Sequence, residues 1–132
     1  MNKKNKQDKI IVLSGSFNPL SLDDVLLISK ARRQGDWIVI GVFSDEYVVE
    51  KLDEEIVFDH EARISRIQNL RGVDEVFRFD DKDGTSVDLL MKVQMVYPDA
   101  EIWFITEDEG TTTIPETKIK DIKFLNLGIT KK

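Results

Sequence analysis

The chain has 132 residues, 41% of them hydrophobic and 33% charged, which is typical of one folded globular domain and not of a disordered chain. Its formal net charge of −6 argues against nucleic-acid binding, which needs a basic surface. The absence of cysteine excludes disulfides and thiolate metal ligands and fits a cytoplasmic protein. No apolar run approaches the roughly 20 residues of a membrane-spanning helix, so we expect no membrane partner.

Short β-branched runs alternate with longer segments of helical period along the chain. The runs predict strands at residues 9–14, 37–43, 75–79, 101–106 and 122–127. Helical spacing covers residues 22–34, 59–70 and 86–97, each followed by a glycine or a proline that ends it. This order predicts an α/β fold, a Rossmann-like three-layer α/β/α sandwich with a five-stranded, mainly parallel sheet.

Neither repeats nor linkers divide the chain. We therefore expect one domain over residues 9–128, a disordered or frayed N-terminus at 1–8 and a short tail at 129–132. Ligands of parallel sheets bind at the carboxyl ends of the strands, so the loops after the predicted strands are the places for a site. The one long segment without a clear period, residues 107–120, is a candidate functional loop.

The loop after the first predicted strand carries a family resemblance. It reads Gly15-Ser16-Phe17-Asn18-Pro19-Leu20-Ser21-Leu22-Asp23-Asp24 and resembles the G-x-F-D-P-x-H-x-G-H signature of the cytidylyltransferase-like nucleotidyltransferases. Further matches follow in family order at residues 33–42, 44–46, 61–63 and 69–76. Segments 79–88 and 113–116 are similar to short stand-alone members such as those of tailed phages, which suggests a phage or bacterial source. The resemblance spans roughly residues 9–128.

The resemblance implies a nucleotide site. In the family the loop glycine admits a nucleoside triphosphate, and the two histidines at the helix start bind its phosphates and stabilise the charge that develops during transfer. Carried over residue by residue, the nucleotide-binding positions are Gly15, Ser16, Phe17, Asn18, Lys51, Arg63, Glu107 and Asp108. Asn18 replaces the family aspartate.

The histidines themselves are missing, because Ser21 and Asp24 occupy their positions and Asp23 replaces the glycine between them. The spacing Ser21-x-x-Asp24 predicts a capping box, in which the helix start satisfies its own donors. A carboxylate about 4 Å from a phosphate oxygen would also repel it by about 1 kcal/mol in water, and more in a desolvated pocket. The sequence therefore predicts a phosphate site that has become a helix cap.

Two further phosphate-binding segments depart from the family. The loop that in the family holds a glycine pair, an aspartate and an arginine reads Glu107-Asp108-Glu109-Gly110 here. When residues 113–116 are aligned with the family's N-I-P-E segment, the C-terminal S-T-x-I-R motif is truncated; residues 116–120 are the alternative alignment for that motif. Positive charge is thus lost at several phosphate-facing positions.

Several candidates also have a structural interpretation. Arg63 is either a nucleotide contact or a surface arginine paired with Asp59 or Glu61, and both interpretations stay open. We expect no catalytic role for His60, since neither a second histidine nor a placed base accompanies it.

The acidic residues Asp23, Asp24, Glu107, Asp108 and Glu109 could hold a divalent cation at one mouth of the sheet, but a solvated acidic rim explains them better. Both tryptophans, Trp37 and Trp103, lie in predicted strands and are expected in the core.

Two functional hypotheses follow. The leading one is a catalytically degenerate homologue, a pseudoenzyme that binds a nucleotide, a small phosphorylated ligand or a protein partner, with a homodimer among the expected states. For this hypothesis the sequence points to no particular cofactor. The rival is an active nucleotidyltransferase that transfers CMP or AMP from CTP or ATP to a phosphorylated small molecule and releases pyrophosphate. In that case Lys51 and Arg63 would hold the phosphates and Mg²⁺ would be bridged through the acidic loops.

Overall fold

The computed structural model describes residues 8–106 and 115–127. Its strands are β1 (Lys9–Gly15), β2 (Trp37–Val42), β3 (Glu75–Phe77), β4 (Glu101–Ile105) and β5 (Ile122–Leu125). Its helices are α1 (Leu22–Arg32), α2 (Asp45–Glu50), α3 (His60–Gln68), α4 (Val87–Val96) and the 3-10 helix η1 (Pro115–Lys118). Apart from Asp8, the predicted terminal segments 1–8 and 129–132 lie outside the described residues.

The five strands form one sheet in the order β3-β2-β1-β4-β5, and every pairing is parallel. This confirms the predicted Rossmann-like sheet. β1 lies at the centre, and the chain runs outward through β2 and β3 before it crosses back to β4. The direction of winding changes between β1 and β4, and ligands of such sheets bind at that point, beyond the carboxyl ends of the strands.

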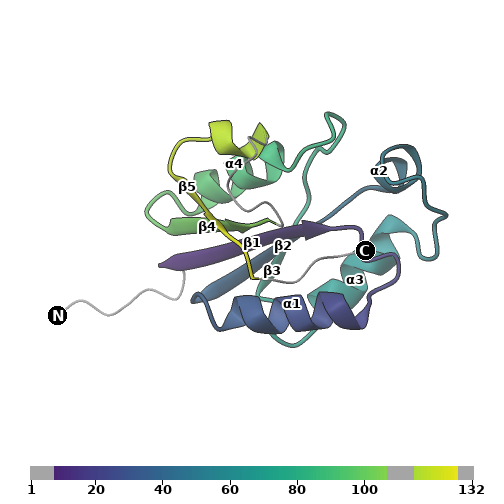
Figure 1. Ribbon diagram of the computed structural model, residues 1–132, viewed down its shortest axis with the longest axis horizontal. Helices are drawn as coiled ribbons and strands as arrows, with labels where there is room; N and C mark the ends of the chain where they lie inside the picture. Colours follow the sequence, from purple (N-terminus) through teal and green to yellow (C-terminus); the bar gives the residue numbers. More distant parts are fainter. Residues whose placement is uncertain (1–7, 107–114, 128–132) are drawn as a thin grey trace.

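Helices cover both faces of the sheet, α1 and α3 on one and α4 with η1 on the other (Figure 1). Successive residues of β1 supply the two faces in turn. Ile11 and Leu13 pack in the cluster that includes Ile28 of α1, whereas Ile10 and Val12 pack in the cluster that includes Leu89 of α4. Alternation between two apolar layers explains why the strand reads as a continuous hydrophobic run.

The predicted elements all occur. All but β1 are shorter than predicted, and β1 extends one residue further, to Gly15. β3 stops at Phe77 and α1 stops at Arg32, both two residues before the predicted boundary. The two tryptophans, expected in the core, are only partly buried at its margins, where each indole N–H donates to a glutamate, Trp37 to Glu75 and Trp103 to Glu101. Among the described residues, no helix is long and apolar enough to cross a membrane.

Candidate functional site

A cavity of about 460 Å³ opens at the carboxyl end of β1, between the start of α1 and the segment that follows α2. Three of the predicted nucleotide-binding residues, Gly15, Ser16 and Asn18, line it. The other predicted residue of that loop, Phe17, is only 3% exposed, and its side chain packs in the core on the α1 side. The structure thus places a cavity, here called the first cavity, at the loop that carries the family resemblance.

The predicted capping box is confirmed at the start of α1. The backbone N–H of Asp24 donates to Oγ of Ser21 over 3.1 Å, and the backbone N–H of Ser21 donates to Oδ2 of Asp24 over 3.0 Å. Asp24 is 6% exposed, so its carboxylate is held inside the fold. Two N–H groups at this helix end, which could have faced a phosphate, are satisfied by the chain itself.

The first cavity is acidic. Asp23, Asp24 and Glu54 line it, and its described lining residues include neither lysine, arginine nor histidine. Carboxylates in a partly enclosed space repel an anion more strongly than they do in bulk water, because the effective dielectric constant is lower. Among the described residues, the first cavity thus combines negative charge with a helix end whose N–H groups are already bonded.

Lys51, which the resemblance assigns to nucleotide binding, does not line the first cavity. It lines a second cavity of about 580 Å³ at the carboxyl ends of β2 and β3, next to Tyr47 and Phe79. Gly84 lies close to the Lys51 side chain. Its φ is +81°, and a Cβ added there would lie 3.5 Å from Cε of Lys51. The structure thus separates this lysine from the Gly15–Asp24 loop.

Charges of both signs surround the second cavity. Its four cationic side chains are Lys51, Arg78, Lys82 and Lys92, and its acidic ones are Glu46, Glu50, Asp80 and Asp81. Arg78 pairs with Glu61 and Lys92 with Asp88, while Lys51 and Lys82 make no ion pair with any described residue. Two ammonium groups are therefore available at the second cavity.

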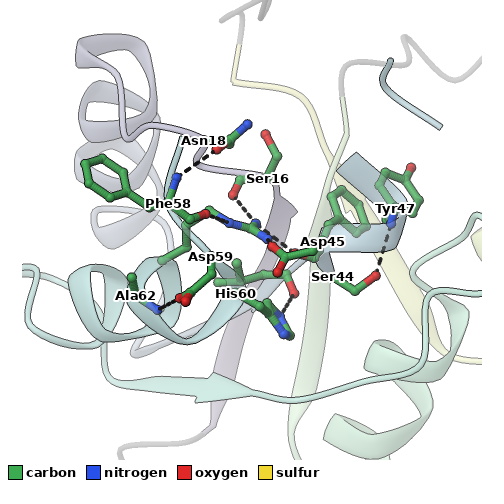
Figure 2. A network of polar contacts seen from close by, with 12 residues as sticks. Ser16, Asn18, Ser44, Asp45, Tyr47, Phe58, Asp59, His60 and Ala62 are labelled. Atoms are coloured by element: carbon green, nitrogen blue, oxygen red, sulfur yellow. Dashed lines mark hydrogen bonds and ion pairs between the residues drawn. The ribbon is translucent and has the colours of Figure 1, made fainter. Parts of the chain in front are cut away.

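Arg63 is fully buried, and the interpretation of it as a surface arginine paired with Asp59 or Glu61 is wrong. Its Nε donates to Phe58 O, its Nη1 donates to Ser16 O and Phe43 O, and its Nη2 pairs with Asp45 at 2.7 Å. Figure 2 shows Ser16, Phe58 and Asp45 converging from separate segments. The guanidinium joins the ends of the first two strands to the start of α3.

Two other residues of this region have structural contacts. Asp59 accepts from the backbone N–H of Ala62 and so caps α3, and Arg63 pairs with Asp45 instead. His60, for which we expected no catalytic role, lies 2.9 Å from Val42 O through its Nε2 (Figure 2). Both side chains hold the start of α3 in place.

Two sets of polar contacts were not predicted, one that includes Ser14 of the first cavity and one that includes Ser44 and Asp81 of the second. Glu116 of η1 accepts from the backbone N–H of Ser86, whose Oγ lies 2.7 Å from Oγ of Ser14. Asp81 accepts from both the N–H and the hydroxyl of Ser44. The partners are far apart in the sequence, so only the serine-and-acid composition of these loops could have hinted at them.

Burial raises the pKa of the Tyr47 hydroxyl, and the negative charges of Asp81 and Glu116 raise it further. The phenol therefore stays a neutral hydrogen-bonding group at physiological pH, beside the second cavity that it lines.

The remaining predicted residues, Glu107 and Asp108, lie outside the described residues together with Glu109. Within residues 8–106 and 115–127, no group of three or more acidic or histidine side chains is arranged to hold a metal ion.

Comparison with known proteins gives the same family that the Gly15–Asp24 loop resembles. The profile described as Cytidylyltransferase-like matches residues 12–126. Glycerol-3-phosphate cytidylyltransferase of Bacillus subtilis (strain 168) is 24% identical over 127 residues, covering 86% of this chain and 95% of that protein.

Two solved structures share the fold. The lipopolysaccharide core biosynthesis protein of Thermoplasma volcanium GSS1 superposes with a TM-score of 0.65 and 18% identity, covering 94% of this chain and 98% of that chain. A Vibrio parahaemolyticus protein provisionally named a nicotinate-nucleotide adenylyltransferase superposes with a TM-score of 0.63 and 20% identity, covering 95% and 80%. The profile spans most of the chain, from β1 to the residue that follows β5, so this chain belongs to the cytidylyltransferase-like family.

Proposed function

We propose that this protein is a cytidylyltransferase-like pseudoenzyme, which keeps the family scaffold but has lost nucleotidyl transfer and acts by binding. The observation that carries the proposal is the capping box between Ser21 and Asp24, formed by the two residues at the positions of the family histidines. An imidazole can donate a hydrogen bond to a phosphate oxygen, whereas an ionised carboxylate can only accept. The transferred phosphate would thus meet negative charge where the transition state needs positive charge.

The second cavity is the place we propose for a ligand, a small phosphorylated molecule. Lys51 and Lys82 supply two ammonium groups without an ion pair among the described residues, and Tyr47 and Phe79 supply an aromatic wall. A phosphate held by two lysines gains charge-assisted hydrogen bonds, which are roughly twice as strong as neutral ones. The acidic residues at the same cavity would favour a ligand that also carries an amine or hydroxyl groups.

The loss of transfer is tested by incubating the protein with CTP or ATP, Mg²⁺ and a panel of phosphorylated sugars and alcohols. We expect no release of pyrophosphate above the blank. Release that disappears in the Asp24→Ala variant would contradict the proposal and support the active enzyme instead. Ser21→Ala is the matched control, because it opens the capping box but leaves the buried carboxylate in place.

Binding is tested by thermal unfolding with the same phosphorylated compounds. A ligand at a hundredfold excess over Kd stabilises the folded protein by about 2.7 kcal/mol, which raises the unfolding temperature measurably. We expect the Lys51→Gln variant to lose this response and the Lys120→Gln variant, the same charge change away from both cavities, to keep it. If no phosphorylated sugar or alcohol shifts the unfolding temperature and only CTP or ATP does, the ligand assignment is contradicted.

A further inference from the structure

The segment that follows α2, residues 52–58, forms one wall of the first cavity through Leu52 and Glu54. We call it the strap. It contains neither helix nor strand, and most of it is exposed, including Leu52 at 38% and Val57 at 55%. Its first half is tied to α2 by a bond from the Glu54 N–H to Val48 O. The exposed side chains of Leu52 and Val57 therefore contribute little to holding the strap against the loop that begins at Gly15.

Asn18 supplies the connection to the second half of the strap. Its Nδ2 donates to Glu55 O over 2.7 Å, and its Oδ1 accepts from the Val57 N–H over 2.7 Å and from the Phe58 N–H over 3.4 Å. Figure 2 shows the Asn18 side chain facing Phe58. An aspartate, the residue that the family resemblance expects here, has no donor and could not make the bond to the Glu55 carbonyl.

Arg63 holds the end of the same segment. Its guanidinium binds the carbonyl of Phe58, the last strap residue, and also the carbonyl of Ser16 in the loop. Because this side chain is fully buried, its hydrogen bonds are screened little by water and breaking them is costly. The strap is thus joined to the loop at two points, through Asn18 from the loop side and through Arg63 from α3.

We infer that Asn18 and Arg63 are positioning residues that keep the strap docked before any ligand arrives, so that the first cavity is preformed. The Glu54 carboxylate is then a permanent part of its wall. Compared with the aspartate of the family signature, Asn18 thus adds a hydrogen-bond donor, so its amide binds the strap through both nitrogen and oxygen. This inference is independent of the proposed function, because a docked strap would serve an active enzyme and a binding protein alike.

The test is hydrogen exchange of single backbone amides in the unliganded protein. In the Asn18→Ala variant we expect the Val57 amide to exchange at least about tenfold faster, because its acceptor is gone. The Ala62 amide, held by Asp59 over 2.9 Å, is the internal control and should not change. An equal rise at Ala62 would mean general destabilisation and would overturn the inference.

The Asn18→Asp variant separates the two halves of the tether. It keeps the acceptor for Val57 but loses the donor to the Glu55 carbonyl, so we expect an intermediate exchange rate at Val57. A rate equal to that of the unmodified protein would refute the role of the amide donor. The exchange rate of the Val57 amide in the unmodified protein tests the inference even where a variant fails to fold. If this amide exchanges as fast as one in an unstructured peptide, the strap is not docked.

Discussion

The backbone N–H of Ser86 donates to Oε2 of Glu116 over 2.6 Å, which joins the start of α4 to η1, 30 positions further along the chain. Both residues are buried, Ser86 at 3% and Glu116 at 7% exposed. Ser86 stands at the N-cap position of α4 but its own side chain makes no capping bond. A carboxylate from a distant segment caps this helix instead, where the helix dipole favours negative charge.

Replacing this carboxylate should weaken the fold. We expect Glu116→Ala to lower the free energy of unfolding by about 1–3 kcal/mol, because it leaves the buried Ser86 N–H without its acceptor. Urea unfolding followed by circular dichroism measures this. Glu50→Ala, at an exposed position of α2, is the control and should change stability by no more than about 0.5 kcal/mol. Equal losses in the two variants would contradict the capping role.

The capping box of α1 predicts a second stability difference. Ser21→Ala removes the acceptor for the Asp24 N–H and should cost about 0.5–2 kcal/mol. Ser29→Ala, an exposed change in the same helix, should be neutral or slightly stabilising, because alanine is the better helix former. Chemical denaturation of both variants compares them directly, and a stable Ser21→Ala protein would show that the box contributes little.

Arg63 should be far more important for stability than an exposed arginine. Arg63→Met keeps much of the side-chain volume but leaves the Asp45 carboxylate and several carbonyls without their donor, so we expect a loss of about 3–5 kcal/mol. Arg78 forms a bidentate pair with Glu61, but the two side chains are 63% and 66% exposed. Arg78→Met should therefore change stability far less than Arg63→Met in the same unfolding experiment, because water screens the exposed pair.

Acidification should remove one stabilising contribution of α4. The Asp80 N–H bound to the Asp88 carboxylate lowers the pKa of Asp88. Burial opposes this effect, and Lys92 lowers the pKa further, so that the pKa stays below its usual value. A folded-state pKa below the unfolded value of about 3.9 contributes stability that is complete above that pH and is lost as the pH falls through the folded value.

The measurement is the free energy of unfolding of the native protein and of Asp88→Asn between about pH 6 and pH 2. We expect the native protein to be the more stable at pH 6 and the two to converge as the pH falls below about 4. A difference that stays constant over this range would contradict the lowered pKa.

Alkali should act on Tyr97. Burial raises the pKa of its hydroxyl to about 12, and the hydrogen bond that it donates to Glu75 contributes to the rise. Because the folded pKa lies above the unfolded value of about 10, its contribution to stability is complete below pH 10 and is lost as the pH rises towards 12. Tyr97→Phe should therefore lose less stability than the native protein over this interval. The titration of Tyr97 is followed by phenolate absorbance in the near ultraviolet. A titration midpoint at the ordinary tyrosine pKa of about 10 would contradict the assignment.

Local patterns predicted the elements of the fold well. The five strands and the three longer helices follow from short β-branched runs and helical spacing, because each pattern shows which face of an element must be buried. The capping box was predictable for the same reason, since Ser21 and Asp24 are three residues apart and depend on nothing outside their own turn. The resemblance of the Gly15–Asp24 loop also located the first cavity.

Contacts across the sequence were beyond such patterns. The burial of Arg63 depends on carbonyls that come from three separate segments. Lys51 stands at the C-terminal end of α2, and its side chain lines the second cavity and not the first. Asn18 can donate to Glu55 O and accept from the Val57 N–H only if the strap lies beside it. The sequence of residues 52–58 carries no pattern that predicts this contact.

The sequence by itself thus determined the family, the parallel sheet and the reversal of charge at the start of α1, because each depends on residue type and short-range order. The tertiary structure decided which side chains share a cavity and which charges are buried. That division has a physical cause. A helix or strand forms from neighbouring residues, but the surroundings of a charged group are set by whichever distant segments the packed core brings beside it.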